Sequence, residues 1–328
     1  WMFIGSYDKL RNEIIDNRTL TSLIQLEYSG FAGATVPICT YTFHNSFIKG
    51  YKGGYVRLSD FVGAAVQAPK ALEAIKNPDC GWVYRRDADT FKQIPGTPIA
   101  YWTGEAAISA YRRFPELGKR IITREGMATA DNDRFVHFWW ECPYSSIGFG
   151  ASAPKDEIAL SHRWFPYQKG GDYRKWFGNN ALVVFYESDG EAIKNNTDPK
   201  TGRIRSHNYN GAFSFKEGIT WSALSSGSIH VRYSPQGSLF DSKGAKGFGA
   251  SHQDNLYALC LINSSTASEH LSFLAPTLDF KVGDIAQIPD ADKDVEPVAG
   301  LGELLIDGSK SDWDSFETSW DFKRHPLV

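Results

Sequence analysis

The sequence predicts an α/β segment followed by a longer, mostly β segment. A helical pattern and two β-forming runs occupy residues 7–43, which is how many α/β domains end. From about Gly118 the pattern changes to short runs of β-forming residues separated by Gly, Asn and Ser. The chain has 328 residues and is 42% hydrophobic, which is enough for two domains with their own cores.

The N-terminal pattern is a helix, a strand, a turn and a second strand. Residues 7–17 carry an apolar stripe, and Ser6 stands where a helix cap is expected. Residues 20–27 are mostly apolar and predict a strand. A glycine-bearing turn at 29–33 then leads to β-forming residues at 36–43.

Two helices are predicted next. The first begins near Pro69, because proline is favoured at the first position of a helix, and the second covers residues 103–114. Proline and glycine at 94–98 separate the two helices. We therefore expect residues 63–117 to form a helical connector.

Residues 118–290 are predicted to form a mixed, mostly β domain. This domain is expected to contain two short helices, at 254–262 and 266–274, and to close with an extended piece at 282–289. The remaining residues, 291–328, are acidic and are interpreted as a linker.

The net charge of −3 hides a gradient along the chain. Residues 161–235 hold 10 Lys/Arg against 6 Asp/Glu, whereas residues 279–328 hold 5 against 12. A mildly basic middle is compatible with local contact to nucleic acid. Aromatic residues make up 14% of the chain and include ten Trp. Most are expected in cores, although surfaces that stack on bases or bind carbohydrate also need them.

Several classes of protein do not fit this sequence. Its cysteines stand far apart without a CxxC pair, which fits a reducing compartment and argues against a disulfide scaffold or a structural zinc site. No signal peptide and no apolar run of bilayer length is found, so we expect a cytoplasmic protein without a membrane partner. Because the chain starts on an apolar stretch at Trp1, we expect a fragment that begins partway through a domain.

Common catalytic motifs are absent. The sequence contains no HExxH, no phosphate-binding GxxxxGK[ST] and no nucleophile elbow. Residues 244–249 are glycine-rich but lack the strand-to-helix context of a nucleotide loop, so a plain loop is predicted. The eight histidines show no metal-ligand spacing, and no metal site is predicted.

Three groups of residues resemble a known family. Residues 1–43, with Glu27-Tyr28-Ser29-Gly30-Phe31 and then Val36, resemble the closing section of the catalytic domain in N6-adenine DNA methyltransferases. Residues 126–135 resemble the opening motif of target-recognition domains in single-chain restriction-modification enzymes. Four further strings resemble the PglX-type adenine-specific DNA methyltransferases of BREX phage-defence systems, namely 164–179, 215–222, 283–289 and 312–320.

This resemblance spans nearly the whole chain and implies a function. It implies adenine-N6 methylation of double-stranded DNA by S-adenosylmethionine in phage defence or restriction-modification, with other phage-defence proteins as candidate partners. Residues 1–62 would be the remainder of a Rossmann-like catalytic domain, and 118–290 the DNA target-recognition domain. The family's methyl-donor loop and its Asn-Pro-Pro-Tyr motif are expected upstream of Trp1. This segment alone is therefore expected to be inactive.

Phe31 is the catalytic candidate. Methylating the exocyclic amine of adenine requires the base to leave the helical stack. In the family an aromatic residue of the hairpin turn stacks on the extruded base, and Phe31 sits at the matching position. The alternative is a turn phenylalanine that packs on its own domain.

The tract 169–179 is predicted to contact the DNA backbone. Gly170 and Gly171 would let N–H groups approach phosphates, while Lys169, Arg174 and Lys175 would supply neutralising charge. The alternative is a structural turn whose aromatic residues anchor the core.

Base reading requires side chains that offer paired donors or acceptors in the major groove. The candidates on expected loops are Asn132, Arg134, Arg203, Arg205, Asn208 and Arg232. Thr129 and Lys216 lie within the resembling strings and complete the predicted DNA-binding set. Two other functions stay open, namely a specificity module that works with a separate catalytic subunit and an aromatic domain that binds a ligand other than DNA.

Overall fold

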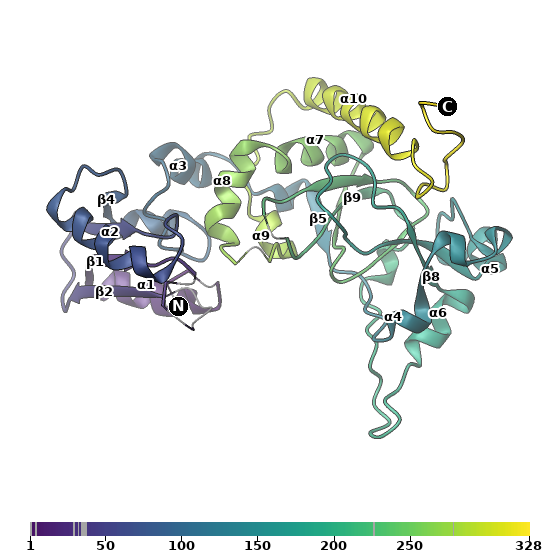
Figure 1. Cartoon of the computed structure of the whole chain (residues 1–328), viewed down its shortest axis with the longest axis horizontal. Helices are drawn as coiled ribbons and strands as arrows, with labels where there is room; N and C mark the ends of the chain where they lie inside the picture. The colour runs from purple at the N-terminus through teal and green to yellow at the C-terminus, as the bar shows by residue number, and fades with distance from the viewer. Residues whose placement is uncertain are drawn as a thin grey trace. The chain divides into compact units, whose positions relative to one another are not determined.

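The structure is a computed structural model of the chain (Figure 1) that describes residues 2–3, 5–28, 30–31, 33, 38–225, 227–277 and 279–328. The chain divides into two compact units, residues 1–113 and 114–328. The first unit has one four-stranded sheet and the second has two. Each unit has hydrophobic core residues of its own.

The first unit is a mixed sheet with short helices. Its strands run in the order β2-β1-β3-β4, where β1 pairs antiparallel with β2 and parallel with β3, and β4 is antiparallel to β3. The elements are η1 (Gly5–Tyr7), α1 (Asp8–Asn17), β1 (Thr19–Gln25), β2 (Cys39–His44), β3 (Lys52–Arg57), α2 (Ala64–Lys76), β4 (Val83–Asp87), η2 (Ala88–Gln93) and α3 (Glu105–Arg113).

A buried arginine fastens α1 to the rest of this unit. Arg11 is 1% exposed, and its Nε donates to the carbonyl oxygen of Thr97 at 2.8 Å. On the same side of α1, Ile15 packs with Leu20, Tyr55 and other residues of the sheet and the η2 region. The core of the first unit therefore contains residues that precede β1 as well as residues that follow β4.

The structure confirms the first predicted helix and strand as α1 and β1. The expected cap at Ser6 is wrong, because the residue before α1 is Tyr7 and makes no side-chain cap. The helix expected to begin near Pro69 begins at Ala64 and includes that proline. Strand β2 covers most of the run predicted at 36–43, of which residues 36 and 37 lie outside the described residues.

The second unit is built on two four-stranded sheets. One sheet is entirely antiparallel in the order β10-β9-β12-β5, and the other has the order β11-β7-β8-β6 with β11 parallel to β7. The strands are β5 (Ile121–Arg124), β6 (Val136–Phe138), β7 (Trp164–Gln168), β8 (Leu182–Phe185), β9 (Gly218–Trp221), β10 (Val231–Ser234), β11 (Leu239–Phe240) and β12 (Lys246–Gly249).

Helices cover the antiparallel sheet. Helix α7 packs against β9, β10 and β12, and α10 lies along α7 (Figure 1). The helices of this unit are α4 (Asn132–Phe135), α5 (Glu157–Ser161), α6 (Glu187–Lys194), α7 (His252–Ile262), α8 (Ser265–Leu274), α9 (Val282–Ala286) and α10 (Val295–Trp313). The 3-10 turns are η3 (Leu117–Lys119), η4 (Trp139–Glu141), η5 (Tyr144–Ser146) and η6 (Gly211–Phe213).

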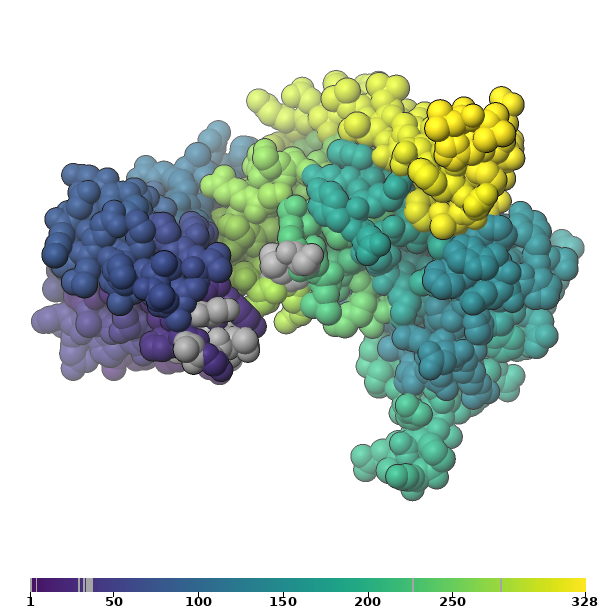
Figure 2. Space-filling view, viewed as in Figure 1, coloured from purple at the N-terminus to yellow at the C-terminus, as the bar shows by residue number. Residues whose placement is uncertain are grey.

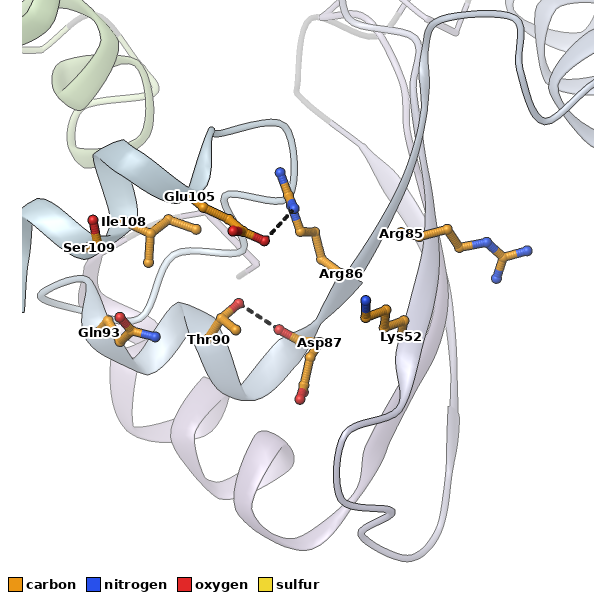
Figure 3. Close-up of a pocket in the computed structure, with 9 residues that line it drawn as sticks. All are labelled: Lys52, Arg85, Arg86, Asp87, Thr90, Gln93, Glu105, Ile108 and Ser109. Carbon is orange, nitrogen blue, oxygen red and sulfur yellow. Dashed lines mark hydrogen bonds and ion pairs between the residues drawn. The ribbon is translucent and has the colours of Figure 1, made fainter.

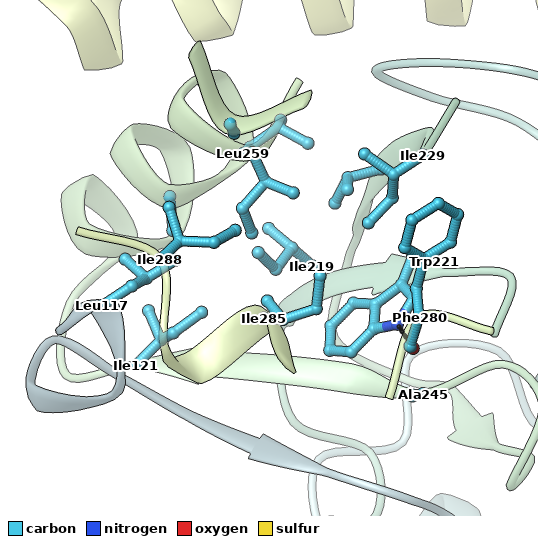
Figure 4. Close-up of a cluster of buried hydrophobic side chains, with 14 of the residues drawn as sticks. Leu117, Ile121, Ile219, Trp221, Ile229, Ala245, Leu259, Phe280, Ile285 and Ile288 are labelled. Carbon is cyan, nitrogen blue, oxygen red and sulfur yellow. Dashed lines mark hydrogen bonds between the residues drawn. The ribbon is translucent and has the colours of Figure 1, made fainter. Parts of the chain in front are cut away.

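The core between this sheet and its helices is apolar and includes a tryptophan (Figure 4). Trp221 is fully buried, and its indole N–H donates to the carbonyl oxygen of Phe280 at 2.9 Å. Ile219 and Leu259 pack in the same cluster, from β9 and α7. A buried indole with a satisfied N–H is stable in an apolar core.

The structure confirms two predicted helices of the second unit, α7 and α8. Three other expectations are corrected. The glycine-rich run 244–249 is largely strand β12, and the piece expected to be extended at 282–289 begins with helix α9. Residues 291–328 are not only a linker, because α10 buries Ala299, Gly302 and Ile306 against α7.

The expected helical connector at 63–117 is also corrected. Strand β4 lies within that range and completes the first sheet by pairing with β3. The boundary between the two compact units falls between Arg113 and Phe114. The hydrophobic pattern of the two helices was visible in the sequence, but the pairing of β4 depends on residues some thirty positions earlier.

Lys246 is a fully buried lysine in the central strand β12. Its Nζ donates to the carbonyl oxygen of Lys216 at 2.8 Å and lies between the rings of Phe240 and Phe248. Burial lowers the pKa of Lys246 from 10.5 to about 7, since the interior disfavours the charged form.

This burial predicts a pH dependence of stability. Between pH 7 and pH 9 the unfolded chain holds a proton on Lys246 that the folded chain has largely released, so stability should rise with pH by at most about 1.4 kcal/mol per unit. Lys246→Met should remove that slope, whereas Lys216→Met should keep it. Urea unfolding at a series of pH values measures the slope. An unchanged slope in Lys246→Met would contradict the prediction.

Candidate nucleic-acid interface

Residues 126–134 open a surface on the second unit. The N–H of Met127 donates to the carbonyl oxygen of Phe240 at 3.0 Å, and Ala128 exchanges backbone hydrogen bonds with His207. A Cβ at Gly126 would lie 1.9 Å from the carbonyl oxygen of Phe240. Only glycine lets the chain pass at this point, and this accounts for the first residue of the string 126–135.

The turn after Ala128 exposes two of the predicted base readers. Ala130 has φ 57°, and the carboxylate of Asp131 caps α4 by accepting the N–H of Arg134 at 3.2 Å. Buried Thr129 donates its hydroxyl to Oδ1 of Asn132 at 2.9 Å. Asn132 and Arg134 are exposed, so Thr129 orients this surface without belonging to it.

A buried carboxylate ties this turn to the sheet. Asp241 is 3% exposed and accepts hydrogen bonds from the hydroxyl of Tyr167 at 2.7 Å and from Nζ of Lys169 at 2.8 Å. Nζ of Lys169 also donates to Oδ1 of Asn132 at 3.0 Å. Burial and the neighbouring carboxylate raise the pKa of Tyr167 well above its ordinary value. Lys169 thus neutralises Asp241 while its ammonium borders the surface.

Residues 196–205 form a second part of the surface, here called the basic hairpin. The N–H of Asp198 donates to the carbonyl oxygen of Arg203 at 2.8 Å, and the N–H of Arg205 to that of Asn196 at 2.8 Å. The carboxylate of Asp198 accepts the N–H of Thr201 at 2.8 Å, and such bonds lower its pKa. Figure 2 shows the segment around residue 200 projecting from the body of the second unit.

The basic hairpin carries exposed cations and has a fixed base. Lys200, Arg203 and Arg205 are all exposed. Nη2 of Arg205 donates to the carbonyl oxygen of Ala130 at 3.3 Å, which joins the hairpin to the turn. At the base, buried Asn196 donates its side-chain amide to the carbonyl oxygen of Thr129 at 2.9 Å.

These contacts define one continuous surface. The basic surface comprises the exposed or half-buried residues Asn132, Arg134, Lys169, Lys200, Arg203, Arg205 and Lys243. Lys243 joins it because its N–H donates to Oδ1 of Asp241 at 2.7 Å. Five of the seven were predicted from sequence, and Lys200 and Lys243 were missed. Lys200 lies in the turn 198–202, so the turn signal itself could have identified it.

Apart from Lys169, the charged residues of the predicted phosphate tract lie elsewhere, and their contacts correct the prediction. Nη2 of Arg174 pairs with Asp312 at 2.5 Å, and its guanidinium lies 5.2 Å from the ring of Trp313. Nζ of Lys175 donates to the carbonyl oxygen of Asn263, at the end of α7, at 2.8 Å. The two side chains fasten α10 and α7, so their charge is used within the protein.

The two glycines of this tract also have a structural role. Gly170 has φ 91° and is buried, and a Cβ there would lie 3.0 Å from Oγ of Ser222. Gly171 has φ 125° and is exposed, with Asn179 against the position of its missing Cβ. Both positions favour glycine because of backbone conformation and close packing.

Three further predicted residues are placed differently. Arg232 is not on a loop but in β10, where it is fully buried, and desolvation lowers its pKa to about 10. The amide of half-buried Asn208 faces the hydroxyl of Tyr186 at 3.5 Å. Lys216 is exposed, and its ammonium and the guanidinium of Arg124 lie 5.1 and 5.4 Å from the ring of Phe213. Because Arg232 is fully buried, it cannot reach a base in this conformation.

Phe31 lies in the connection between β1 and β2, which form the antiparallel hairpin expected there. Its side chain is 54% exposed. The start of the connection is held by Gln67, a buried residue of α2 whose Oε1 accepts the N–H of Glu27 at 3.1 Å. The exposed ring is therefore not needed to fill the core of the first unit.

Among the described residues there is no group of three or more His, Cys, Asp or Glu side chains that could bind a metal ion. No helix among them combines the length and the apolar character needed to cross a membrane.

Comparison with known proteins relates the chain to adenine-specific methyltransferases. No family model matches it. The chain is 40% identical over 336 residues to the adenine-specific methyltransferase PglX of Lacticaseibacillus casei (strain Zhang), covering 100% of this chain and 27% of that protein. It is 32% identical over 337 residues to the adenine-specific methyltransferase BrxX of Escherichia coli O9:H4 (strain HS), covering 100% of this chain and 26% of that protein.

The resemblance to PglX-type methyltransferases that the motifs indicate is thus confirmed along the whole chain. The chain spans about a quarter of the length of these curated relatives. Among solved structures, the type IIG restriction endonuclease BpuSI matches 94% of this chain and 40% of its own, at a TM-score of 0.38 and 11% identity. A likeness of that size is too weak to establish a shared fold.

The contacts of Asp241 predict that its removal is costly. Asp241→Ala would remove the shorter of the two hydrogen bonds of the buried Tyr167 hydroxyl and the counter-charge of the Lys169 ammonium, so the free energy of unfolding should fall by about 3 kcal/mol. Asp241→Asn keeps an acceptor oxygen and should cost less. Urea unfolding measures both, and a loss below about 1 kcal/mol in Asp241→Ala would show that Asp241 does not hold the surface together.

Proposed function

We propose that this chain supplies the DNA-recognition part of an S-adenosylmethionine-dependent adenine-N6 DNA methyltransferase. Its whole length is similar to a quarter of two proteins named adenine-specific methyltransferases. The single observation that carries recognition is the basic surface, in which the basic hairpin projects as a hydrogen-bonded, positively charged element beside an exposed Asn and Arg. Double-stranded DNA is the partner that this chemistry fits.

The shape of the basic hairpin suits a groove. The major groove of B-form DNA is about 12 Å wide and admits a two-stranded β ribbon. The cross-strand hydrogen bonds of Asp198 and Arg205 make the hairpin such a ribbon. Because the carboxylate of Asp198 already holds the tip, little backbone ordering would be needed on binding.

The residues of the basic surface divide into two roles in this proposal. Arg203 and Arg205 can pair with guanine through two donors, and Asn132 can pair with adenine. Lys200 and Lys243 act as point charges that position phosphates without reading sequence. Lys169, whose charge is paired with Asp241, holds Asn132 in place. Arg134 is exposed and can serve either role.

Catalysis would add Phe31 to this recognition. An exposed aromatic ring in a supported hairpin connection can stack on a base that has left the helix. S-adenosylmethionine would bind outside these residues. The one glycine-rich run of the sequence, 244–249, forms strand β12 and offers no cradle, because a Cβ at Gly244 would lie 2.3 Å from the carbonyl oxygen of Gln168.

A host-protecting role is what the resemblance to the PglX-type methyltransferases of BREX phage-defence systems implies. We propose that the intact protein acts in restriction-modification or phage defence, alongside other proteins of that system, in the cytoplasm. A specificity module that works with a separate catalytic subunit remains the second candidate. Gene sequence upstream of Trp1 that encodes Asn-Pro-Pro-Tyr would decide for the single-chain enzyme, and its absence for the module.

The proposed function predicts how DNA binding depends on salt. Lys200→Ala should reduce the log–log slope of affinity against salt by about one unit, since it removes one phosphate contact. Arg203→Ala and Arg205→Ala should each cost about 1–3 kcal/mol on the cognate sequence and relax specificity there, since each removes a base contact. Fluorescence anisotropy with a labelled duplex, measured from about 50 to about 200 mM salt, gives the slopes.

Two residues of the tract 169–179 serve as matched controls. Arg174→Ala and Lys175→Ala remove the same charge from side chains that contact α10 and α7. They should lower stability by about 1 kcal/mol and leave the salt slope unchanged. Equal loss of slope in these controls and in the hairpin variants would reject the basic surface as the interface.

The second prediction concerns Phe31 in the intact enzyme. Phe31→Ala should lower the rate of methyl transfer by roughly 5- to 150-fold, as expected for about 1–3 kcal/mol of stacking, and should leave duplex binding nearly unchanged. Phe31→Trp should retain activity. Tyr28→Ala is the control, because Tyr28 is equally exposed in the same connection. Unchanged turnover in Phe31→Ala would remove Phe31 from the catalytic pocket.

A further inference from the structure

The first unit contains a polar pocket that the proposed function does not use (Figure 3). It has a volume of about 250 Å³ and lies between β3, β4, η2 and α3. Its lining includes Lys52, Arg86, Thr90, Gln93 and Ser109. All of these residues belong to the first unit, so the pocket is complete within it.

Two cations of the pocket lack a full set of partners. No described residue makes a hydrogen bond or an ion pair with the exposed ammonium of Lys52. Nη2 of Arg86 donates to the carbonyl oxygen of Thr103 at 3.1 Å, but the side chain is 27% exposed and Nη1 makes no hydrogen bond with a described residue. An acceptor that enters the pocket can therefore take a charge-assisted hydrogen bond from this guanidinium.

The acids that border the pocket do not fill this need. Nη1 of Arg86 is 3.7 Å from Glu105, whose side chain is 92% exposed, and a long pair in solvent contributes little. Asp87 accepts the N–H of Asp89 at 3.0 Å and so caps η2. Figure 3 shows the carboxylate of Asp87 pointing away from Arg86. The positive groups therefore face the pocket with weak local compensation.

Neutral donors complete the lining. The side-chain amide of Gln93 makes no hydrogen bond with a described residue, and it can donate. The hydroxyls of Thr90 and Ser109 donate to the carbonyl oxygens of Asp87 and Ala106, at 2.7 and 2.9 Å. An oxyanion is the chemistry that meets an ammonium, a guanidinium N–H and an amide together.

We propose that this pocket binds a phosphate group of a nucleic-acid strand, with Lys52 and Arg86 as its charged contacts. A volume of 250 Å³ corresponds to about eight waters at ~30 Å³ each, which leaves room for a phosphate with its sugar. The inference rests on the proposed function for the source of the phosphate. The first unit would then hold a strand through contacts independent of the basic surface.

The test is a lysine footprint on the chain mixed with duplex DNA. Acetylation of each lysine by a soluble acylating reagent is followed by mass spectrometry, with and without duplex. Lys52, the first residue of β3, should be protected by the duplex, whereas Lys49, an exposed lysine of the preceding β2–β3 connection, should stay reactive. Equal reactivity of Lys52 with and without duplex would overturn the proposal.

The affinity of variants gives an independent readout. Lys52→Ala should reduce the log–log salt slope of duplex binding by about one unit, and Lys49→Ala should leave it unchanged. Equal effects of the two variants would show that the positive charge near residues 49–52 attracts DNA in general, and would reject the pocket as a phosphate site. Arg86→Gln should act like Lys52→Ala, while thermal unfolding checks that it remains folded.

The source of the phosphate and the proposed function are separated in the same experiment. Inorganic phosphate, with the ionic strength held constant, should protect Lys52 only at phosphate concentrations well above those at which the duplex protects it, because a strand is held by several contacts at once. Protection of Lys200 and Lys243 without Lys52 would retain the proposed function and reject the pocket. If no lysine is protected by any duplex, the proposed function fails. Equal protection of Lys52 by inorganic phosphate and by duplex at the same phosphate concentration would reject the strand as the source of the phosphate.

Discussion

The buried charge of Asp241 is the constraint on which the recognition surface depends. A carboxylate that is 3% exposed needs a cation and hydrogen-bond donors, and Lys169, Tyr167 and the N–H of Lys243 supply them. The backbone of Asp241 also bonds to Gly126 and Gln168. One residue thereby connects β7, the end of β11 and the turn that displays Asn132 and Arg134. Satisfying this charge sets the geometry of its neighbours.

Positive charge in the second unit is divided between support and display. Arg174 and Lys175 bond to the ends of α10 and α7, and Arg232 is enclosed in β10. Lys200 and Arg203 stand on the basic hairpin, where neither side chain forms an ion pair with a described residue. A count of basic residues over 161–235 mixes the two groups, which explains why local composition is a poor guide to the interface.

The two proposed contacts with nucleic acid have different physical character. The basic surface is convex and carries Arg and Asn side chains that can distinguish bases. The pocket bordered by Lys52 and Arg86 is concave and presents only charge and simple donors, which suits a phosphate. Base recognition and phosphate binding in the pocket would thus lie in separate units of the chain. The exposed ring of Phe31 lies in the unit that contains the pocket.

Sequence alone determined the elements whose signals are local and the family that the chain resembles. Helices α1, α7 and α8 follow from periodicity, and Gly126 marks a place where the backbone admits no side chain. Tertiary structure decided which polar residues are free. Lys169 and Lys175 are close in sequence and alike in charge, yet one borders Asp241 and the other ends α7. The physical reason is that a long cationic side chain goes to the nearest unsatisfied acceptor, and that acceptor is brought there by distant parts of the chain.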